Sequence, residues 1–190
     1  KANPIVLAAA CLRKNNPDVS IYVVDVSSQA RPDTDWRHFP HKYGFKVFKR
    51  DSFLRELVPQ FGRLFNFRLL SRVWDVELAM RDVKENNVVF MDTDIFSLNP
   101  LRPVEGIDNP EFFYSNYNNG VWFYNKKARS TKIVFDFWKG MICRAIHDTD
   151  FRHEIYHRNP QYGTYYMQDE IVFRSLCQLL PNHVKSVDMK

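Results

Sequence analysis

Residues 88–100 read VVFMDTDIFSLNP, and this stretch decides how the rest of the chain is interpreted. Four apolar residues run into Asp92 and Asp94, and an apolar stretch then resumes. A buried strand that ends in this way places two carboxylates at the edge of a sheet, where open α/β sheets bind ligands. Two like charges disfavour each other in a partly desolvated cleft. A divalent cation with oxygen ligands removes that conflict, so the pattern predicts a metal site.

Length and composition indicate an ordinary globular chain. The 190 residues suffice for one domain with a sizeable core, and 45% of them are hydrophobic. The formal net charge of +5 suits a small anionic ligand. The sequence has no dense run of Lys and Arg, so its charge does not indicate a nucleic-acid partner. We therefore expect one domain over residues 1–190.

Cysteine usage and hydropathy bear on the compartment. Cys11, Cys143 and Cys177 are odd in number and widely spaced, and each lies in an apolar helical context. This favours buried free thiols over a disulfide framework or a zinc site. No signal peptide is visible, and no apolar run approaches the roughly 20 residues of a membrane span. These features favour a cytoplasmic location for this segment.

Hydrophobic periodicity predicts alternating helices and strands along the chain. The expected helices cover residues 4–15, 67–85, 131–147 and 168–180, and the expected strands cover 19–26, 44–48, 88–92, 111–115 and 121–124. Residues 27–42 and 148–166 read as loops, and Asn118-Asn119-Gly120 reads as a turn between the last two strands. The alternation predicts an α/β fold with a mostly parallel sheet flanked by helices. Residues 111–124 would form a small antiparallel insertion.

Four motifs follow one another in an order that carries a resemblance. They are Phe67-Arg68-Leu69-Leu70, the 89–94 stretch, Asn118-Asn119-Gly120-Val121-Trp122-Phe123 and Gln168-Asp169-Glu170. Together they resemble the nucleotide-diphospho-sugar glycosyltransferases of the GT-A fold, with an Asp-x-Asp motif, over roughly residues 4–185. The resemblance implies a Rossmann-like sheet. It also implies transfer of a sugar from a nucleoside diphosphate sugar, with a UDP-sugar favoured, to a hydroxyl of a glycan or glycoprotein.

The resemblance also implies roles for the donor-binding residues. Asp94 would ligate Mn²⁺ or Mg²⁺, and Asp92 would share the metal or contact the ribose. The cation would neutralise the departing nucleoside diphosphate. Arg68 would reach a phosphate or the base, with a solvated arginine at a helix start as the alternative.

A second group of residues would face the sugar. Asn118 would donate its amide to a sugar hydroxyl, with Asn119 and Gly120 completing the binding segment; simple turn chemistry is the alternative. Trp122 would stack on the sugar, although filling the core is the favoured reading.

The start of the last predicted helix carries the catalytic candidates. Asp169 would be the general base of an inverting enzyme. In a retaining enzyme, Asp169 or Gln168 would stabilise an oxocarbenium-like species, and the sequence leaves both mechanisms open. Glu170 is the fallback, and a helix N-cap is the structural alternative for Asp169.

The pattern departs from the family at its start. The family opens with a strand and a loop that cradle the nucleobase, whereas this chain begins at the helix that would follow them. We therefore expect that first strand to be missing from this segment, which leaves the base open. We also expect that a longer chain can carry further domains.

Two other functions are compatible with parts of the pattern. Haloacid-dehalogenase-like phosphohydrolases also end an apolar strand in Asp-x-Asp and use the first Asp as the nucleophile. They usually carry Thr or Val two residues after the second Asp, where this chain has Phe96, and their motif lies near the start of the chain. The other alternative is a non-catalytic carbohydrate-binding domain, which only the missing front end supports.

Overall fold

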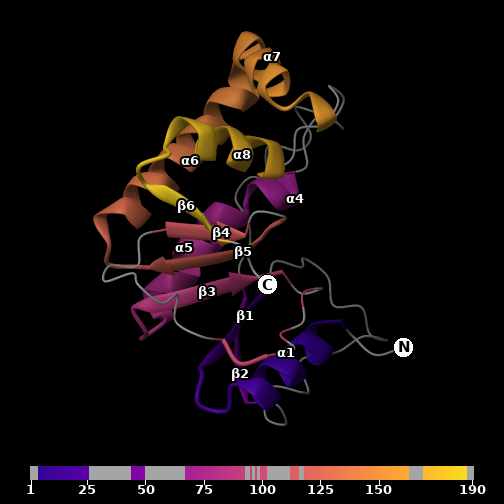
Figure 1. Ribbon diagram of the computed structural model, residues 1–190, viewed down its shortest axis with the longest axis vertical. Coiled ribbons are helices and arrows are strands. Elements are labelled where there is room, and N and C mark those ends of the chain that lie inside the picture. The colour runs from indigo at the N-terminus through magenta and orange to yellow at the C-terminus, as the bar shows by residue number, and fades with distance from the viewer. Residues whose placement is uncertain are drawn as a thin grey trace. The chain divides into compact units, whose positions relative to one another are not determined.

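The computed structural model describes residues 4–25, 44–49, 67–92, 95, 97, 99–101, 112–115, 118–162 and 169–187. The chain divides into two compact units, each built from two stretches of sequence. Unit 1 comprises Lys1–Asp51 and Met91–Asn109, and unit 2 comprises Ser52–Phe90 and Pro110–Lys190. The described elements are a mixture of helices and strands, as the sequence predicts (Figure 1). A single domain over residues 1–190 stays a prediction.

Unit 1 contains helix α1 (Pro4–Asn15) and the parallel pair β1 (Ile21–Asp25) and β2 (Phe45–Lys49). Proline suits the first turn of α1, because the amide hydrogen that it lacks has no partner in the helix there. Ile21 lies opposite Phe45 in the register, and both pack with Ala9 in a small core. The helix and both strands agree with the expected ranges to within two residues.

Arg13 holds the chain between α1 and the two strands. Its guanidinium donates to the carbonyl oxygens of Pro17 at 2.5 Å, Val19 at 2.9 Å and Gly44 at 2.7 Å. Gly44 has a φ of 62°, and a Cβ there would lie 3.4 Å from the guanidinium. A contact of that length is ordinary, so the positive φ is the constraint here, and glycine adopts it without strain.

Unit 2 contains a four-stranded sheet in the order β3-β5-β4-β6. Its strands are β3 (Asn87–Met91), β4 (Phe112–Ser115), β5 (Asn118–Asn125) and β6 (Val184–Val187). β4 pairs antiparallel with β5 and parallel with β6.

The direction of β3 follows from its contacts with the end of β5. The amide N–H of Lys126 donates to the carbonyl of Asn86, and the Asn125 side chain donates to that of Asn87. The start of β3 therefore lies beside the end of β5, so these two strands also run antiparallel. Within the described part, parallel pairing is limited to β1–β2 and β4–β6, and a long parallel sheet is not seen.

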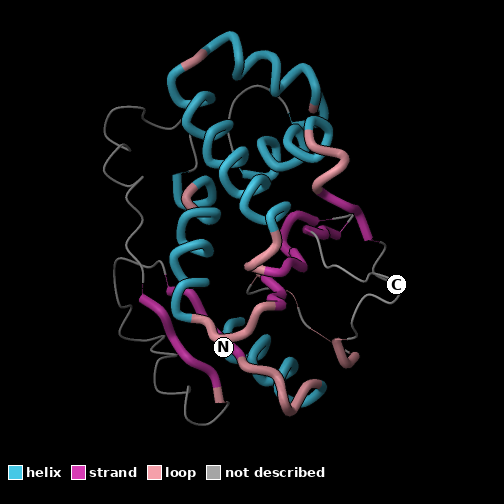
Figure 2. The backbone as a smooth tube through the Cα atoms, turned by 90° about the vertical axis from the view of Figure 1, so that its left-hand side faces the viewer, coloured by secondary structure: helices cyan, strands magenta, loops and turns pink. Residues whose placement is uncertain are grey.

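The helices of unit 2 gather on one face of this sheet (Figure 2). They are α4 (Phe67–Leu70), α5 (Arg72–Asp82), α6 (Arg129–His147), α7 (Thr149–Arg158), the short 3₁₀ helix η5 (Pro160–Tyr162) and α8 (Asp169–Leu179). Over the described ranges, none of the helices combines the length and the apolar character that a bilayer span needs.

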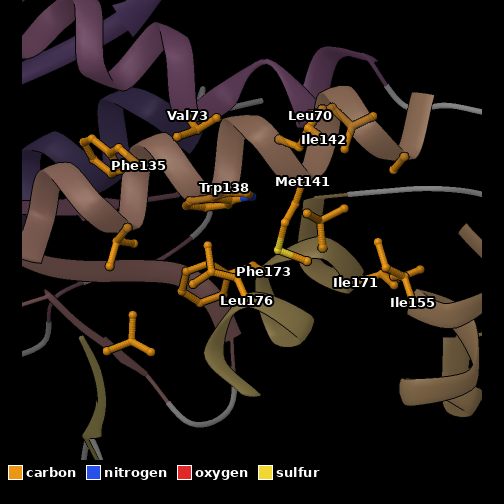
Figure 3. Close-up of a cluster of buried hydrophobic side chains, with 14 of the residues drawn as sticks. Leu70, Val73, Phe135, Trp138, Met141, Ile142, Ile155, Ile171, Phe173 and Leu176 are labelled. Carbon is orange, nitrogen blue, oxygen red and sulfur yellow. The ribbon is translucent and has the colours of Figure 1, made fainter. Parts of the chain in front are cut away.

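The core of unit 2 is aromatic and lies between the sheet and the helices. Trp138 of α6 lies against Phe173 and Leu176 of α8, and Ile142 of α6 lies beside Leu70; these α6 and α8 side chains are at most 1% exposed (Figure 3). Phe112 packs against them from the sheet. Because apolar residues recur at helical spacing, α6 and α8 each have an apolar face, and both faces pack into the same core.

The predicted helix over residues 67–85 is interrupted at Ser71 and ends at Asp82. The Ser71 hydroxyl donates to the buried Asp75 carboxylate at 2.9 Å, and the backbone bends there into the start of α5. Beyond Asp82, the ammonium group of Lys126 donates to the carbonyl of Val83. A lysine from another element thus satisfies a carbonyl left free at the helix end.

The prediction of a loop over residues 148–166 is wrong, because α7 and η5 occupy much of it. Asp148 caps α7 by accepting the Phe151 amide N–H at 2.9 Å. Phe151 and Ile155 are spaced by four residues and are both buried. These two apolar residues are enough to bury one face of α7. Their helical spacing is hard to see in the sequence, because polar and aromatic residues surround them. Strand β6 was also not predicted.

The predicted Asn118-Asn119-Gly120 turn is part of β5. In the register, Tyr114 lies opposite Trp122, whereas Ser115 lies opposite Asn118. The pairing therefore skips residues of β5 at this point. A bulge of this kind accommodates the residue types that favour turns, which explains why the pattern suggested one.

The three cysteines are free, and the expectation that all are buried is wrong for Cys143, which is exposed on α6. Cys11 and Cys177 are partly buried. Burial raises the pKa of the Cys177 thiol to about 12.

We expect replacement of Ile142 with alanine to destabilise the protein by about 2–5 kcal/mol, because a fully buried side chain leaves a cavity. Urea unfolding measures this change. The control is Phe137→Ala on the same helix, where the side chain is 38% exposed, with an expected change within about 0.5 kcal/mol. Equal effects of the two substitutions would contradict the described packing of α6.

A thiol-specific disulfide reagent at pH 8 should modify Cys143 and leave Cys177 unmodified in the folded protein. A thiol reacts as its thiolate, and the raised pKa keeps Cys177 protonated until the pH approaches 12. Mass spectrometry of the labelled peptides measures both sites, and unfolding in urea should expose Cys177 to the reagent. Equally fast labelling of both in the folded state would contradict this placement.

Candidate active site

Asp92 follows β3 directly, as the sequence predicts. The strand ends at Met91, and the Ile95 amide N–H donates to the Asp92 carbonyl at 3.1 Å. The chain therefore turns as soon as the strand ends. Asp92 itself is partly buried.

Asn15, the last residue of α1, and Asn16, which follows it, contact the segment over residues 97–101. The Asn15 side chain donates to the Ser97 carbonyl at 2.6 Å. The Leu101 amide N–H donates to the Asn16 side-chain oxygen, also at 2.6 Å. Asn16 is buried, and its nitrogen donates to a carbonyl within α1. Both ends of the segment from residue 97 to 101 are thereby tied to the end of α1.

The donor set of the predicted metal site suits Mn²⁺ or Mg²⁺. Asp92 offers carboxylate oxygens, the ligand type that these hard cations prefer. Asp94, its predicted partner, lies outside the described residues. Within the described part of the chain, no three His, Cys, Asp or Glu side chains come together as a metal site.

Asp169 is the first residue of α8 and is buried. Its carboxylate forms an ion pair with Arg72 of α5, with Nη1 and Oδ2 3.1 Å apart and side-chain exposures of 16% for Arg72 and 5% for Asp169. A carboxylate is favourable at the start of a helix, so both the helix and the guanidinium stabilise its ionised form.

Arg72 also touches the strand that leads to Asp92. Its guanidinium carbon lies 5.6 Å from the centre of the Phe90 ring, in cation–π contact. Phe90 in turn stacks on Trp122, with ring centres 4.3 Å apart. Arg72 thus joins α5, β3 and α8 within unit 2.

Sequence reasoning missed Arg72, although a signal was present. It lies three residues after Leu69 and four before Val76, on the apolar face of the predicted helix. A charged residue at such a position needs a partner when the helix packs, because burying an unpaired charge is costly. That position could have directed attention to a buried acid elsewhere in the chain.

The structure places Trp122 in the core, with 0% of its surface exposed. Both Phe90 and Trp138 pack against its indole. No face is left on which a sugar could stack, so the assignment of Trp122 to ligand binding is corrected to the core alternative. Gly120 is buried in β5 beside it.

The other predicted residues are placed less fully. Asn118 and Asn119 lie in β5 and Arg68 lies in α4, but their side chains are outside the description. Gln168 is outside the described residues altogether. Glu170, the fallback catalytic residue, pairs with Arg174 one turn along α8 at 3.0 Å.

Comparison with known proteins adds no family to these observations. No protein-family model matches the sequence, and no characterised protein matches it at a significant level. Any functional assignment therefore rests on the residues and their geometry.

We expect Arg72→Met to destabilise the protein by about 3–5 kcal/mol, because it leaves the Asp169 carboxylate buried without its guanidinium. The double variant Arg72→Met/Asp169→Leu should recover most of that loss, since it removes both charges. Urea unfolding measures each variant. Arg158→Met is the matched control, because the Arg158–Glu154 pair at 2.8 Å is half-exposed and contributes about 0–1 kcal/mol. A double variant as unstable as Arg72→Met would argue against this pairing.

Proposed function

We propose that this chain is a metal-dependent glycosyltransferase that uses a nucleoside diphosphate sugar, with a UDP-sugar favoured, and a hydroxyl acceptor on a glycan or glycoprotein. The proposal rests on the end of β3, where the chain turns directly after the strand at Asp92. Carboxylates at such a strand end are well suited to bind a cation that carries a diphosphate. The order of the sequence motifs supports the same assignment.

The GT-A fold is the finer part of this proposal. The sheet of unit 2 supports it in one respect, because β4 and β5 form an antiparallel pair. The sequence predicts an antiparallel insertion over residues 111–124, where these two strands lie. The helices of unit 2 gather on one face of the sheet, which is the arrangement typical of α+β folds, so the helices themselves do not support the GT-A fold.

In the proposed reaction, an acceptor hydroxyl oxygen forms a bond to the anomeric carbon of the sugar. The bond between that carbon and the phosphate oxygen breaks, and its electron pair leaves with the nucleoside diphosphate. The hydroxyl proton passes to a base or to water. Asp92 and Asp94 would hold Mn²⁺ or Mg²⁺, which when bound stabilises the negative charge on the leaving diphosphate.

The remaining roles fall to two parts of the chain. Arg68 would contact the nucleotide, and Asn118 with its neighbours in β5 would contact the sugar. The start of α8 would lie beside the reacting sugar, with Gln168 as the residue that contacts it and Asp169 directly after it in the chain. Asn15 and Asn16 contribute indirectly, because they hold the segment after Asp92 in place.

Asp94→Ala should abolish the stabilisation of the protein by UDP in the presence of Mn²⁺. Ligand at 100 times its dissociation constant stabilises a folded protein by about 2.7 kcal/mol, which thermal unfolding detects readily. The wild-type protein should gain this stabilisation only when Mn²⁺ and UDP are both present. The unfolding temperature without ligand should be unchanged in the variant.

Asp150→Ala, at an exposed position in α7, is the control and should respond to UDP and Mn²⁺ like the wild type. Stabilisation of wild type by free sugar without metal would instead indicate a carbohydrate-binding domain, and turnover of a phosphomonoester would indicate a phosphohydrolase. A screen of nucleotide sugars for Mn²⁺-dependent hydrolysis would identify the donor.

A further inference from the structure

The Arg72–Asp169 ion pair is more enclosed than the other described ion pairs. Its side chains are 16% and 5% exposed, whereas each of the other pairs has a member at least 34% exposed. A general base must reach the proton that it removes, within hydrogen-bond distance of the substrate or through one water. The Asp169 carboxylate is instead turned to a guanidinium and shielded from solvent.

The pair also joins elements that are distant in sequence. Arg72 is the first residue of α5, Asp169 is the first residue of α8, and the guanidinium lies over Phe90 of β3. Phe90 is two residues before Asp92 along the chain. An arginine holds such an arrangement well, because its planar group binds a carboxylate at its edge while its face covers a ring.

We propose that Arg72 is a positioning residue for glycosyl transfer, and that Asp169 serves transfer through this ion pair and is not the general base. The pair fixes the start of α8 against α5 and β3. This inference rests on the proposed function. It assigns a role to Arg72 and changes the role of Asp169.

A positioning role predicts a particular kinetic pattern. Arg72→Met and Asp169→Asn should each lower kcat for transfer by about 10- to 100-fold, because small displacements of reacting groups have effects of this size. The KM for the donor and the requirement for Mn²⁺ should change little. The kcat of the double variant should be no lower than that of the less active single variant, because both substitutions remove the same interaction.

The experiment measures Mn²⁺-dependent transfer or hydrolysis of UDP-sugars by six variants and wild type. The variants are Arg72→Met, Arg72→Lys, Asp169→Asn, Arg72→Met/Asp169→Asn, Arg72→Asp/Asp169→Arg and the control Arg158→Met. Arg72→Lys keeps the charge and should recover part of kcat even if Arg72→Met folds poorly. The charge-reversed double variant keeps an ion pair and should exceed Arg72→Met/Asp169→Asn in kcat, and the control should match wild type.

Two results would overturn the inference. One is full kcat in a folded Arg72→Met protein. The other is a much larger loss in Asp169→Asn than in Arg72→Met, with loss of the acidic limb of the pH–rate profile, which would make Asp169 the base.

Hydrogen exchange separates this inference from the proposed function. Arg72→Lys should speed exchange of the first amides that are hydrogen-bonded within α8, over residues 172–175, relative to Arg158→Met. If wild type turns over no nucleotide sugar, the proposed function fails while faster exchange still supports the fixing of α8 by Arg72. Unchanged exchange in the variant would overturn the inference whatever the activity.

Discussion

Unit 2 depends on the packing of two tryptophans. Trp122 of β5 and Trp138 of α6 meet edge to face with ring centres 4.8 Å apart, and Phe173 of α8 lies 4.6 Å from Trp138. Within the described residues, neither indole N–H has a hydrogen-bond acceptor, so ring contact and buried area must offset that cost. Phe90 also stacks on Trp122, and the Arg72 guanidinium lies over the Phe90 ring. The sheet, two helices and the ion pair thus share one aromatic cluster.

The sequence predicts elements best where apolar spacing is long and regular. Helices α6 and α8 were expected within two residues of their bounds, and β3 was expected to end beside Asp92. Prediction failed where a few tertiary contacts decide the structure. Helix α7 depends on one cap and two buried residues. The Asn-Asn-Gly segment favours a turn by its residue types, but it pairs with β4 as part of β5. The Arg72–Asp169 pair joins residues 97 positions apart, which no local pattern reveals.

The buried pair changes how the candidate site is understood. Sequence reasoning treated Asp169 as a carboxylate presented to a substrate, with a helix cap as its structural alternative. In the structure, the same carboxylate starts α8 and holds that start to α5 through Arg72. A residue can therefore be indispensable for activity through its neighbours, without meeting the substrate. Residues 97–101, which follow the acidic motif, are tied separately to Asn15 and Asn16.

The division of each unit into two stretches of sequence has a consequence for synthesis on the ribosome. Asn16 contacts Leu101, 85 residues later, and β6 joins the sheet at Val184–Val187. Unit 1 therefore remains incomplete while the first stretch of unit 2 emerges, and unit 2 remains incomplete until β6 has been made. Helices α6, α7 and α8 lie within residues 129–179 and make contacts local in sequence, which form quickly. We expect residues 129–179 to nucleate folding, so residues made earlier acquire their structure after residues made later.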